Sequence, residues 1–260
     1  MTNPAPERPF FVGYASKVPS PLVIFSLTAT LGILIGMGFL SFAIGASTSD
    51  PGNGRFIGGR ANFQNYVGMI QELPYPILRT APSEEHPEPR TLMLTAPGKA
   101  GLQDKAIELE GQIINAGGFI LNRGDMDMLQ AAGRAITPAE GELTAVQRAF
   151  TPAPPVPLGR WRLTGEICDG KCYAGAMRPG IGLSHRACAN LCLIGGVPPV
   201  FVSTGEIEGT SFFLLADQDG GPLPEDIYDL VAILVELEGE VERLDDILVF
   251  KVDISQARVF

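Results

Sequence analysis

The sequence predicts a mainly β protein, with one N-terminal transmembrane helix followed by one or two small OB-like β-barrels with short helices. Three observations support this class. A single long apolar segment without charge lies near the N-terminus. Short stretches of strand-like alternation follow between many turns, in a chain with 31 glycines and 22 prolines. Finally, a glycine recurs inside three apolar stretches, and strand glycines bend small barrels closed.

The apolar segment covers residues 21–46 and contains no charged side chain. About 20 apolar residues in a helix span a bilayer, whereas the hydrophobic part of a signal peptide has only about 7–15 residues. We therefore predict an uncleaved helix that crosses the lipid bilayer once, after a disordered tail at residues 1–20. A signal peptide is the competing interpretation, because Ala43-x-Gly45 resembles a cleavage site.

Small residues follow one face of this helix. Thr28, Gly32 and Gly36 recur at every fourth position, and such a pattern lets helix backbones approach closely. We expect this face to pack against other transmembrane subunits of a membrane complex. The alternative is that glycine is simply common in membrane helices.

The flanking charges do not decide the orientation of the helix. Arg8 and Lys17 on one side balance Arg55 and Arg60 on the other. Clustered cysteines fit an oxidising compartment. We therefore expect a single-pass protein of the cell inner membrane with its C-terminal domain in the periplasm.

Residues 47–150 are predicted to form a first extracytoplasmic β unit. Near its end, Thr137, Pro138 and Glu140 match a helix start with a capping box. We expect a short helix there. The proline-rich stretch at 151–157 is extended and fairly stiff, and is the predicted linker between domains.

Residues 158–260 are predicted to form a Cys-containing OB-like domain, whose first strand covers 160–168. The pattern Leu-x-Gly-x-Ile/Val occurs around Gly111, Gly165 and Gly239. Glycines inside strands mark bulges or sharp bends. This repeated pattern favours curled barrels over a flat sandwich.

All four cysteines and one of the two histidines fall within residues 165–199. The spacing is Cys168-x3-Cys172, followed by His185-x2-Cys188-x3-Cys192. A short helix is expected over residues 184–194, capped by Ser184 and ended by two glycines. It would carry the histidine and the last two cysteines on one face, opposite the first two.

Three kinds of chemistry stay open for this cluster. Two disulfides, the preferred interpretation, would pair Cys168 and Cys172 with Cys188 and Cys192, each stabilising the fold by about 3 kcal/mol. A metal site would use the four thiolates, or three of them with His185, for zinc, copper or iron, including an iron–sulfur cluster. A reactive thiol would use His185 as its base. No cofactor is expected other than such a metal ion.

The composition argues against several functions. The formal net charge is −10, from 19 basic and 29 acidic side chains, so no basic patch is available for nucleic acid. The sequence has no nucleotide-binding loop, no paired-carboxylate motif and no hydrolase nucleophile elbow. We therefore favour a protein without catalytic activity of its own.

The stretch CDGKCYAGAMRPGIGLSHRACANLCLIGGVPPVF resembles a signature of uncharacterised bacterial single-pass membrane proteins. The shared elements are D-x-K-C, G-x-M-x-P-G, H-R-x-C-A-x-x-C and G-G-x-P-P. The resemblance implies an extracytoplasmic redox or respiratory setting in which the protein is an accessory. It supplies no catalytic residues.

Together these observations lead us to expect an accessory or structural subunit of a larger membrane electron-transfer complex, respiratory or photosynthetic. The alternative is a periplasmic metal-binding redox protein that uses the Cys/His cluster. An enzyme in its own right is the third choice.

Overall fold

The computed structural model describes residues 18–47, 52–84, 86–139 and 143–260. The chain divides into two compact units, residues 1–50 and residues 51–260, and each is described here by itself. Most of the predicted N-terminal tail, residues 1–17, lies outside the described residues, as does Glu140.

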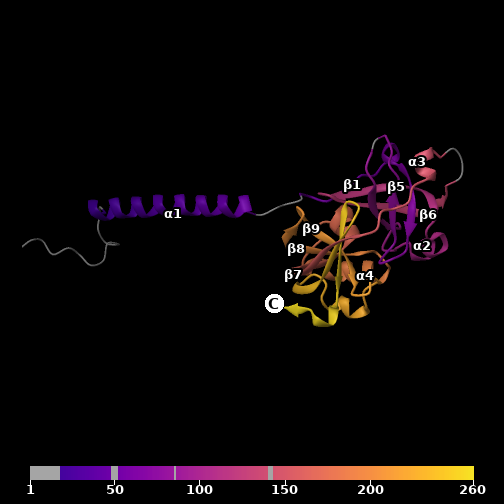
Figure 1. The fold of residues 1–260 in the computed structure, drawn as a ribbon. Coiled ribbons are helices and arrows are strands. Elements are labelled where there is room, and N and C mark those ends of the chain that lie inside the picture. Colours follow the sequence, from indigo (N-terminus) through magenta and orange to yellow (C-terminus); the bar gives the residue numbers. More distant parts are fainter. Residues whose placement is uncertain (1–17, 48–51, 85, 140–142) are drawn as a thin grey trace, which may run out of the picture. The chain divides into compact units, whose positions relative to one another are not determined.

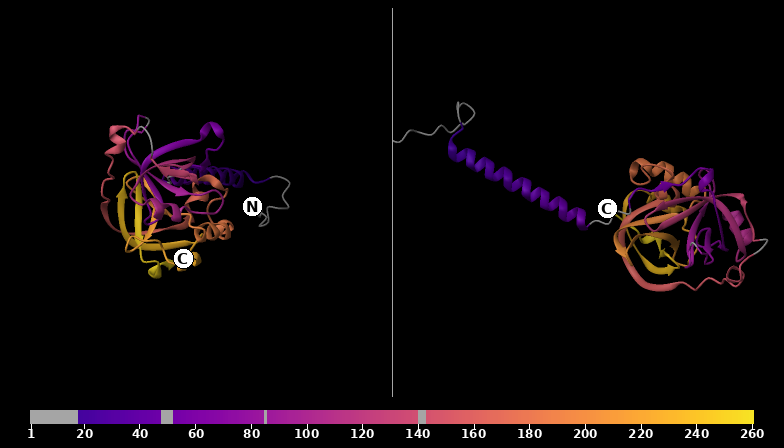
Figure 2. Two further views of the ribbon diagram at one scale, coloured as in Figure 1. Left: turned by 90° about the vertical axis from the view of Figure 1, so that its right-hand side faces the viewer. Right: turned by 90° about the horizontal axis from the view of Figure 1, so that it is seen from above.

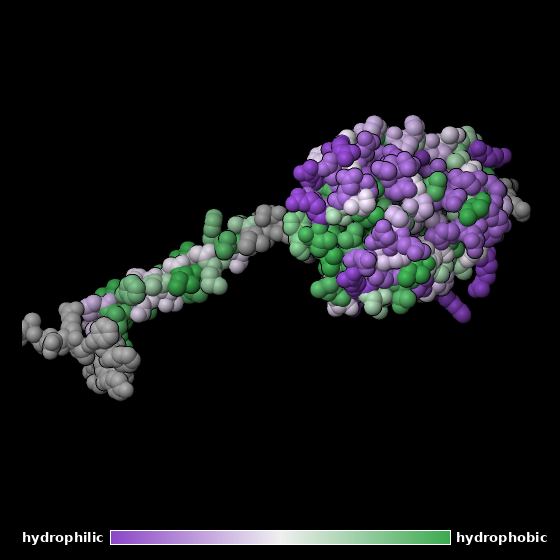
Figure 3. Space-filling view, turned by 90° about the horizontal axis from the view of Figure 1, so that it is seen from below, coloured by the Kyte–Doolittle hydropathy of each residue, from purple (hydrophilic) through white to green (hydrophobic). Residues whose placement is uncertain are grey.

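The first unit contains one long helix, α1 (Ser20–Ser47) (Figure 1). Its segment Ser20–Ala43 has a mean hydropathy of 2.2 and is not buried in the described structure. Figure 3 shows hydrophobic colouring along this helix. The predicted apolar helix is therefore confirmed, and it is long and apolar enough to span a membrane, although a signal sequence would pass the same test.

The small-residue face of α1 consists of Thr28, Gly32 and Gly36. A Cβ atom added at Gly32 or Gly36 would meet no atom within 4 Å. The Thr28 hydroxyl is used inside the helix, where it donates to the carbonyl oxygens of Ile24 and Phe25 at 3.0 Å each.

The second unit begins with a closed five-stranded barrel. Its strands are β2 (Gln64–Gln71), β3 (Ile77–Thr80), β4 (Arg90–Thr95), β5 (Ile113–Arg123) and β6 (Met126–Pro138). They pair in the order β5-β2-β3-β4-β6, and β5 also pairs with β6, which closes the barrel. The β4–β6 pair is parallel. Helix α2 (Gln103–Leu109) connects β4 to β5, and β1 (Arg55–Phe56) extends the edge of β5.

A second closed barrel repeats this arrangement. Its strands are β7 (Val156–Asp169), β8 (Pro199–Ile207), β9 (Thr210–Asp217), β10 (Leu234–Leu244) and β11 (Ile247–Val252). They pair as β11-β9-β8-β7-β10, β10 closes onto β11, and the β9–β11 pair is parallel. Short β12 (Arg258–Val259) pairs with β10. Both barrels have the OB-fold topology, so the predicted OB-like class is confirmed, with two barrels.

The two barrels correspond residue by residue in their strand register. Gly68 pairs with Ile114 and Thr80, and at the same places of the second barrel Gly165 pairs with Val235 and Ser203. A Cβ atom at either glycine would lie 2.2 Å from a carbonyl oxygen of the next strand. Only glycine permits this close approach, which bends the strand and closes the barrel.

A second pair of glycines follows in the fourth strand of each barrel. Gly118 and Gly239 occupy equivalent positions, where a Cβ atom would lie 2.3 Å and 1.9 Å from a carbonyl oxygen. The predicted role of Gly165 and Gly239 is thus confirmed. The prediction was wrong for Gly111, which lies in the turn before β5 with φ +71° and open space around it.

The barrels pack side by side through a shared apolar core (Figure 2). Each barrel also has its own interior core. Equivalent positions of the two barrels meet in the shared core, namely Ile77 and Val200, Met93 and Leu214, and Met128 and Val249. Self-complementary packing of this kind is typical of a two-fold interface. It covers the outer surface of the second and third strands, where OB folds commonly bind ligands.

The connection between the barrels differs from the prediction. Thr137 and Pro138 belong to β6 and pair with Asn115 and Ile114. The connecting helix is α3 (Ala145–Arg148), which begins later, at Thr144, with a capping box formed with Gln147. Pairing with β5 overrides the local helix signal at Thr137, and residues 151–155 then lead into β7.

Candidate metal site

The cysteine-rich segment is an insertion between β7 and β8, the first two strands of the second barrel. It contains a helical turn at Cys172–Ala176, a second turn at Leu183–His185 and helix α4 (Arg186–Ile194). The predicted helix is therefore confirmed. Its expected cap is wrong, because His185 holds the N-cap position and makes no side-chain capping bond. The helix ends at Gly195, as expected.

The structure brings most of the predicted site residues together. The potential ligand atoms of Cys172, His185 and Cys188 all lie within 4.8 Å of one another. Those of Asp169, Cys172 and Cys192 do so as well, so the two sets share Cys172. All of these side chains are buried except that of Cys188, which is partly exposed.

Cys168 lies outside both sets. Its thiol donates a hydrogen bond to Glu166 Oε1 at 3.3 Å, and its side chain packs in the core shared by the barrels. Burial, reinforced by Glu166, raises the pKa of this thiol well above its usual range. All four cysteines are free thiols in this structure, so neither predicted disulfide is present. Cys168 is a core residue here.

Asp169 is a site residue that the sequence analysis did not identify. Its Oδ2 atom lies 2.9 Å from His185 Nε2, and its Oδ1 atom accepts the backbone N–H of Cys172 at 2.8 Å. Both side chains are almost fully buried. One carboxylate thus orients the imidazole and the cysteine turn. The only signal in the sequence was an acidic residue directly after a predicted strand.

A loop of the first barrel closes over the insertion. Lys99, in the loop between β4 and α2, places Nζ 2.6 Å from Cys188 Sγ and 3.6 Å from Cys192 Sγ. From the other side, the buried Lys171 donates to the carbonyl oxygens of Ala96 and Gly98, both at 2.6 Å. The candidate site therefore lies where the two barrels meet.

Two glycines make this close approach of backbones possible. The N–H of Gly101 donates to the carbonyl oxygen of Gly195 at 2.7 Å. A Cβ atom at Gly195 would lie 1.8 Å from the carbonyl oxygen of Lys99. The loop can reach the thiols only because these positions carry no side chain.

Hydrogen bonds within the site separate the acidities of its thiols. The bond with Cys172 is the main cause that lowers the pKa of Cys192, and Lys99 contributes to the same effect. The same bond, together with burial, raises the pKa of Cys172. The bond to Cys188 raises the pKa of Lys99, which keeps the ammonium charged. Cys192 therefore loses its proton more readily than Cys172, and it does so beside the Lys99 ammonium.

Met177 lies at the solvent-facing edge of this group. Its Sδ atom is 3.3 Å from Cys188 Sγ, and the residue is 46% exposed. A cavity of about 190 Å³ adjoins it, with Met177, Cys172, Tyr173 and Arg123 among its lining residues. The guanidinium of Arg123 stacks over the ring of Tyr173 at 4.3 Å.

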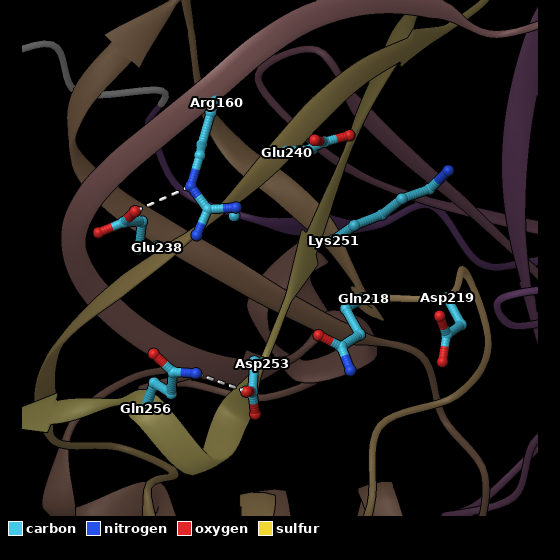
Figure 4. Close-up of a pocket in the computed structure, with 9 residues that line it drawn as sticks. Arg160, Gln218, Asp219, Glu238, Glu240, Lys251, Asp253 and Gln256 are labelled. Atoms are coloured by element: carbon cyan, nitrogen blue, oxygen red, sulfur yellow. Dashed lines mark hydrogen bonds and ion pairs between the residues drawn. The ribbon is translucent and has the colours of Figure 1, made fainter.

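A separate polar hollow of about 310 Å³ lies on the second barrel (Figure 4). Arg160 bonds Glu238 at 2.8 Å and Gln256 bonds Asp253 at 2.9 Å, so these lining groups are paired with one another. No cysteine or histidine lines it. The cysteine insertion is therefore the better candidate for a functional site.

Comparisons of this chain with models of protein families, with curated proteins and with solved structures found no match. The function is therefore argued from the geometry of the site alone.

Proposed function

We propose that this chain is a membrane-anchored metal-binding protein whose paired barrels hold one metal ion. The ligands would be Cys172, His185, Cys188 and Cys192. The observation that carries the proposal is that two groups of potential ligands meet at Cys172, one with His185 and Cys188 and the other with Asp169 and Cys192, beneath a lysine of the other barrel.

The distances support an ion of this kind. Zinc holds thiolate sulfur at about 2.3 Å and imidazole nitrogen at about 2.0 Å, so in a tetrahedral site two ligand atoms lie about 3.5–3.8 Å apart. The ligand atoms of each set lie within 4.8 Å of one another without an ion. The two groups meet at Cys172, and side chains of both would have to draw closer around one ion to complete a coordination sphere.

The contacts behind the ligands also support metal binding. A histidine that binds a metal commonly gives its second ring nitrogen to a carboxylate, which sets its tautomer and orientation. Asp169 makes this contact with His185 Nε2 in the buried interior, which leaves Nδ1 as the ligand atom. When bound, the ion would supply Lewis acidity or electron transfer, while the chain would orient the ligands and limit water.

The other two interpretations use fewer of these features. A disulfide would bring together two sulfur atoms and leave the imidazole pair unexplained. A reactive thiol gains support because Asp169 is the third group that would orient His185 as a base. However, among the described residues no hydrogen bond joins a cysteine to the imidazole, so metal binding remains the better-supported function.

A second candidate function is compatible with the first. The protein would be an accessory subunit of a larger membrane electron-transfer complex, respiratory or photosynthetic, in the inner membrane with its C-terminal unit in the periplasm. The small-residue face of α1 supports this role, since small residues let helix backbones approach closely.

The experiment is metal analysis of the full chain, purified in mild detergent under reducing conditions and offered zinc, copper(I) or iron(II). We expect one ion per chain. Substitution Cys172→Ser should abolish binding, because Cys172 belongs to both ligand sets.

Cys168→Ser is the matched control, because this buried cysteine lies four residues away and outside both sets. It should bind the ion like the natural chain. Equal loss of the ion in both variants would contradict the assignment of ligands. A natural chain that binds none of these metals, while its thiols react rapidly with iodoacetamide, would favour the reactive-thiol alternative.

A further inference from the structure

The ligand atoms of the candidate metal site form a series from exposed to buried. Met177 is 46% exposed and Cys188 is partly exposed, whereas Cys172, His185 and Cys192 are at most 5% exposed. Met177 Sδ and Cys188 Sγ lie 3.3 Å apart at the outer end of this series. Two soft sulfur atoms therefore face solvent before any nitrogen ligand does.

Met177 does not behave as a packing residue. Methionine usually fills gaps in apolar cores, but Met177 is 46% exposed. Its thioether instead lies against a thiol. A thioether is a soft, uncharged ligand that selects copper(I), whereas zinc sites are built from thiolate, imidazole and carboxylate.

A cation already lies against the sulfur atoms of the site. The ammonium of Lys99 rests on the sulfur atoms of Cys188 and Cys192, so the site already holds one positive charge at its thiols. Lys99 comes from an exposed loop, and its long side chain can withdraw into solvent. A copper(I) ion bound to the sulfur atoms would take the place of the ammonium, and the thiol protons of its cysteine ligands would pass to solvent.

The cavity beside the site joins its outer and inner ligands. Met177 and Cys172 both line this space of about 190 Å³. An ion held first by Met177 and Cys188 would thus reach Cys172 through this cavity, which has the sulfur atom of Met177 at one end and that of Cys172 at the other.

We infer that the ion taken by this site is copper(I) and that Met177 and Cys188 are its entry ligands. This inference rests on the proposed metal-binding function and names the metal and its route. Binding involves no electron transfer, because copper enters and stays as the monovalent ion.

The test measures two affinities separately. The full chain in mild detergent, reduced and without oxygen, competes with a chromogenic chelator for copper(I), and in a second titration it binds zinc(II). Met177→Leu should weaken copper(I) binding roughly tenfold, the lower end of what the loss of a supporting contact costs a metal site, and leave zinc affinity unchanged. Met69→Leu, in β2 of the first barrel, is the matched control and should change neither affinity.

The outcomes separate this inference from the proposed function. If the natural chain binds zinc but Met177→Leu leaves copper(I) affinity unaltered, or lowers both affinities equally, the copper assignment is overturned and metal binding stands. If the natural chain binds neither ion, both are overturned.

Discussion

Arg79 and Asp245 form a buried ion pair that joins the two barrels. Arg79 lies in β3, and Asp245 lies in the two-residue turn between β10 and β11. The guanidinium Nε and Nη2 atoms donate to the two carboxylate oxygens at 2.7 Å and 2.5 Å, and the side chains are 3% and 5% exposed. The hydroxyl of Thr91 adds a third contact to the same carboxylate at 3.0 Å.

We predict that Arg79→Met lowers the free energy of unfolding by about 3–5 kcal/mol, because it leaves the Asp245 carboxylate buried without its partner. Urea unfolding of the detergent-solubilised chain measures this. The matched control is Arg243→Met, which removes a pair with Glu208 whose side chains are about 40% exposed. It should cost less than about 1 kcal/mol. Equal losses in the two variants would show that the buried pair does not hold the barrels together.

The interface between the barrels explains why alternation is weak in some strands. In β4, Leu92 and Leu94 enter the first barrel while Met93 enters the shared core. The strand is therefore buried on both faces and reads as a continuous apolar run. The sequence predicts barrels from turns and strand glycines, but nothing local indicates that a second barrel covers the outer face.

The candidate site was predictable only where its residues are close in sequence. The cysteine and histidine spacing on α4 indicated the ligands, and three of the four cysteines meet. Lys99 reaches the thiols from the other barrel, and this contact depends on tertiary packing of Gly101 against Gly195. In sequence, Cys168 looks like a ligand because it lies four residues before Cys172. In the structure it is still part of β7, and its side chain points into the core shared by the barrels.

The strand glycines give a second stability prediction. Gly239→Ala places a Cβ atom 1.9 Å from the carbonyl oxygen of Lys251, so β10 and β11 must separate. We expect the free energy of unfolding to fall by about 2–3 kcal/mol, which is typical of overpacking in a tightly packed barrel. Gly205→Ala is the control, because its Cβ atom would meet nothing within 4 Å. Thermal unfolding should place this control at or above the natural chain; a comparable loss there would contradict the assigned role of Gly239.

The environment of Tyr75 leads us to predict that the stability of the fold decreases at alkaline pH. Its hydroxyl, in the loop between β2 and β3, accepts the N–H of Leu223 from the second barrel at 3.0 Å. Burial is the main cause that raises the pKa of Tyr75 from 10.0 to about 12. Because the folded protein favours the neutral phenol, its contribution is complete below pH 10.0 and is lost as the pH rises toward 12.

Between pH 10.0 and about 12, the free energy of unfolding should fall by about 2–3 kcal/mol. Urea unfolding at a series of pH values compares the natural chain with Tyr75→Phe. The variant should be about 1 kcal/mol less stable at neutral pH, since the N–H of Leu223 loses its acceptor. It should also lose less stability as the pH rises above 10.0. An identical alkaline slope in both proteins would show that Tyr75 does not cause it.

The exposed face of α1 predicts an association with other membrane helices. Gly32 and Gly36 lie on one face without neighbours within the described part of the chain, and small residues allow close helix contacts. Replacing both with leucine should weaken co-purification with partner subunits in mild detergent, as measured by mass spectrometry of the purified complex. Leu34→Ala, on the opposite face of the helix, should leave the partners in place, because in a bilayer that side would face lipid. If the natural chain purifies alone as a monomer, the protein is not a subunit of a complex, and the glycines reflect only the composition of a membrane helix.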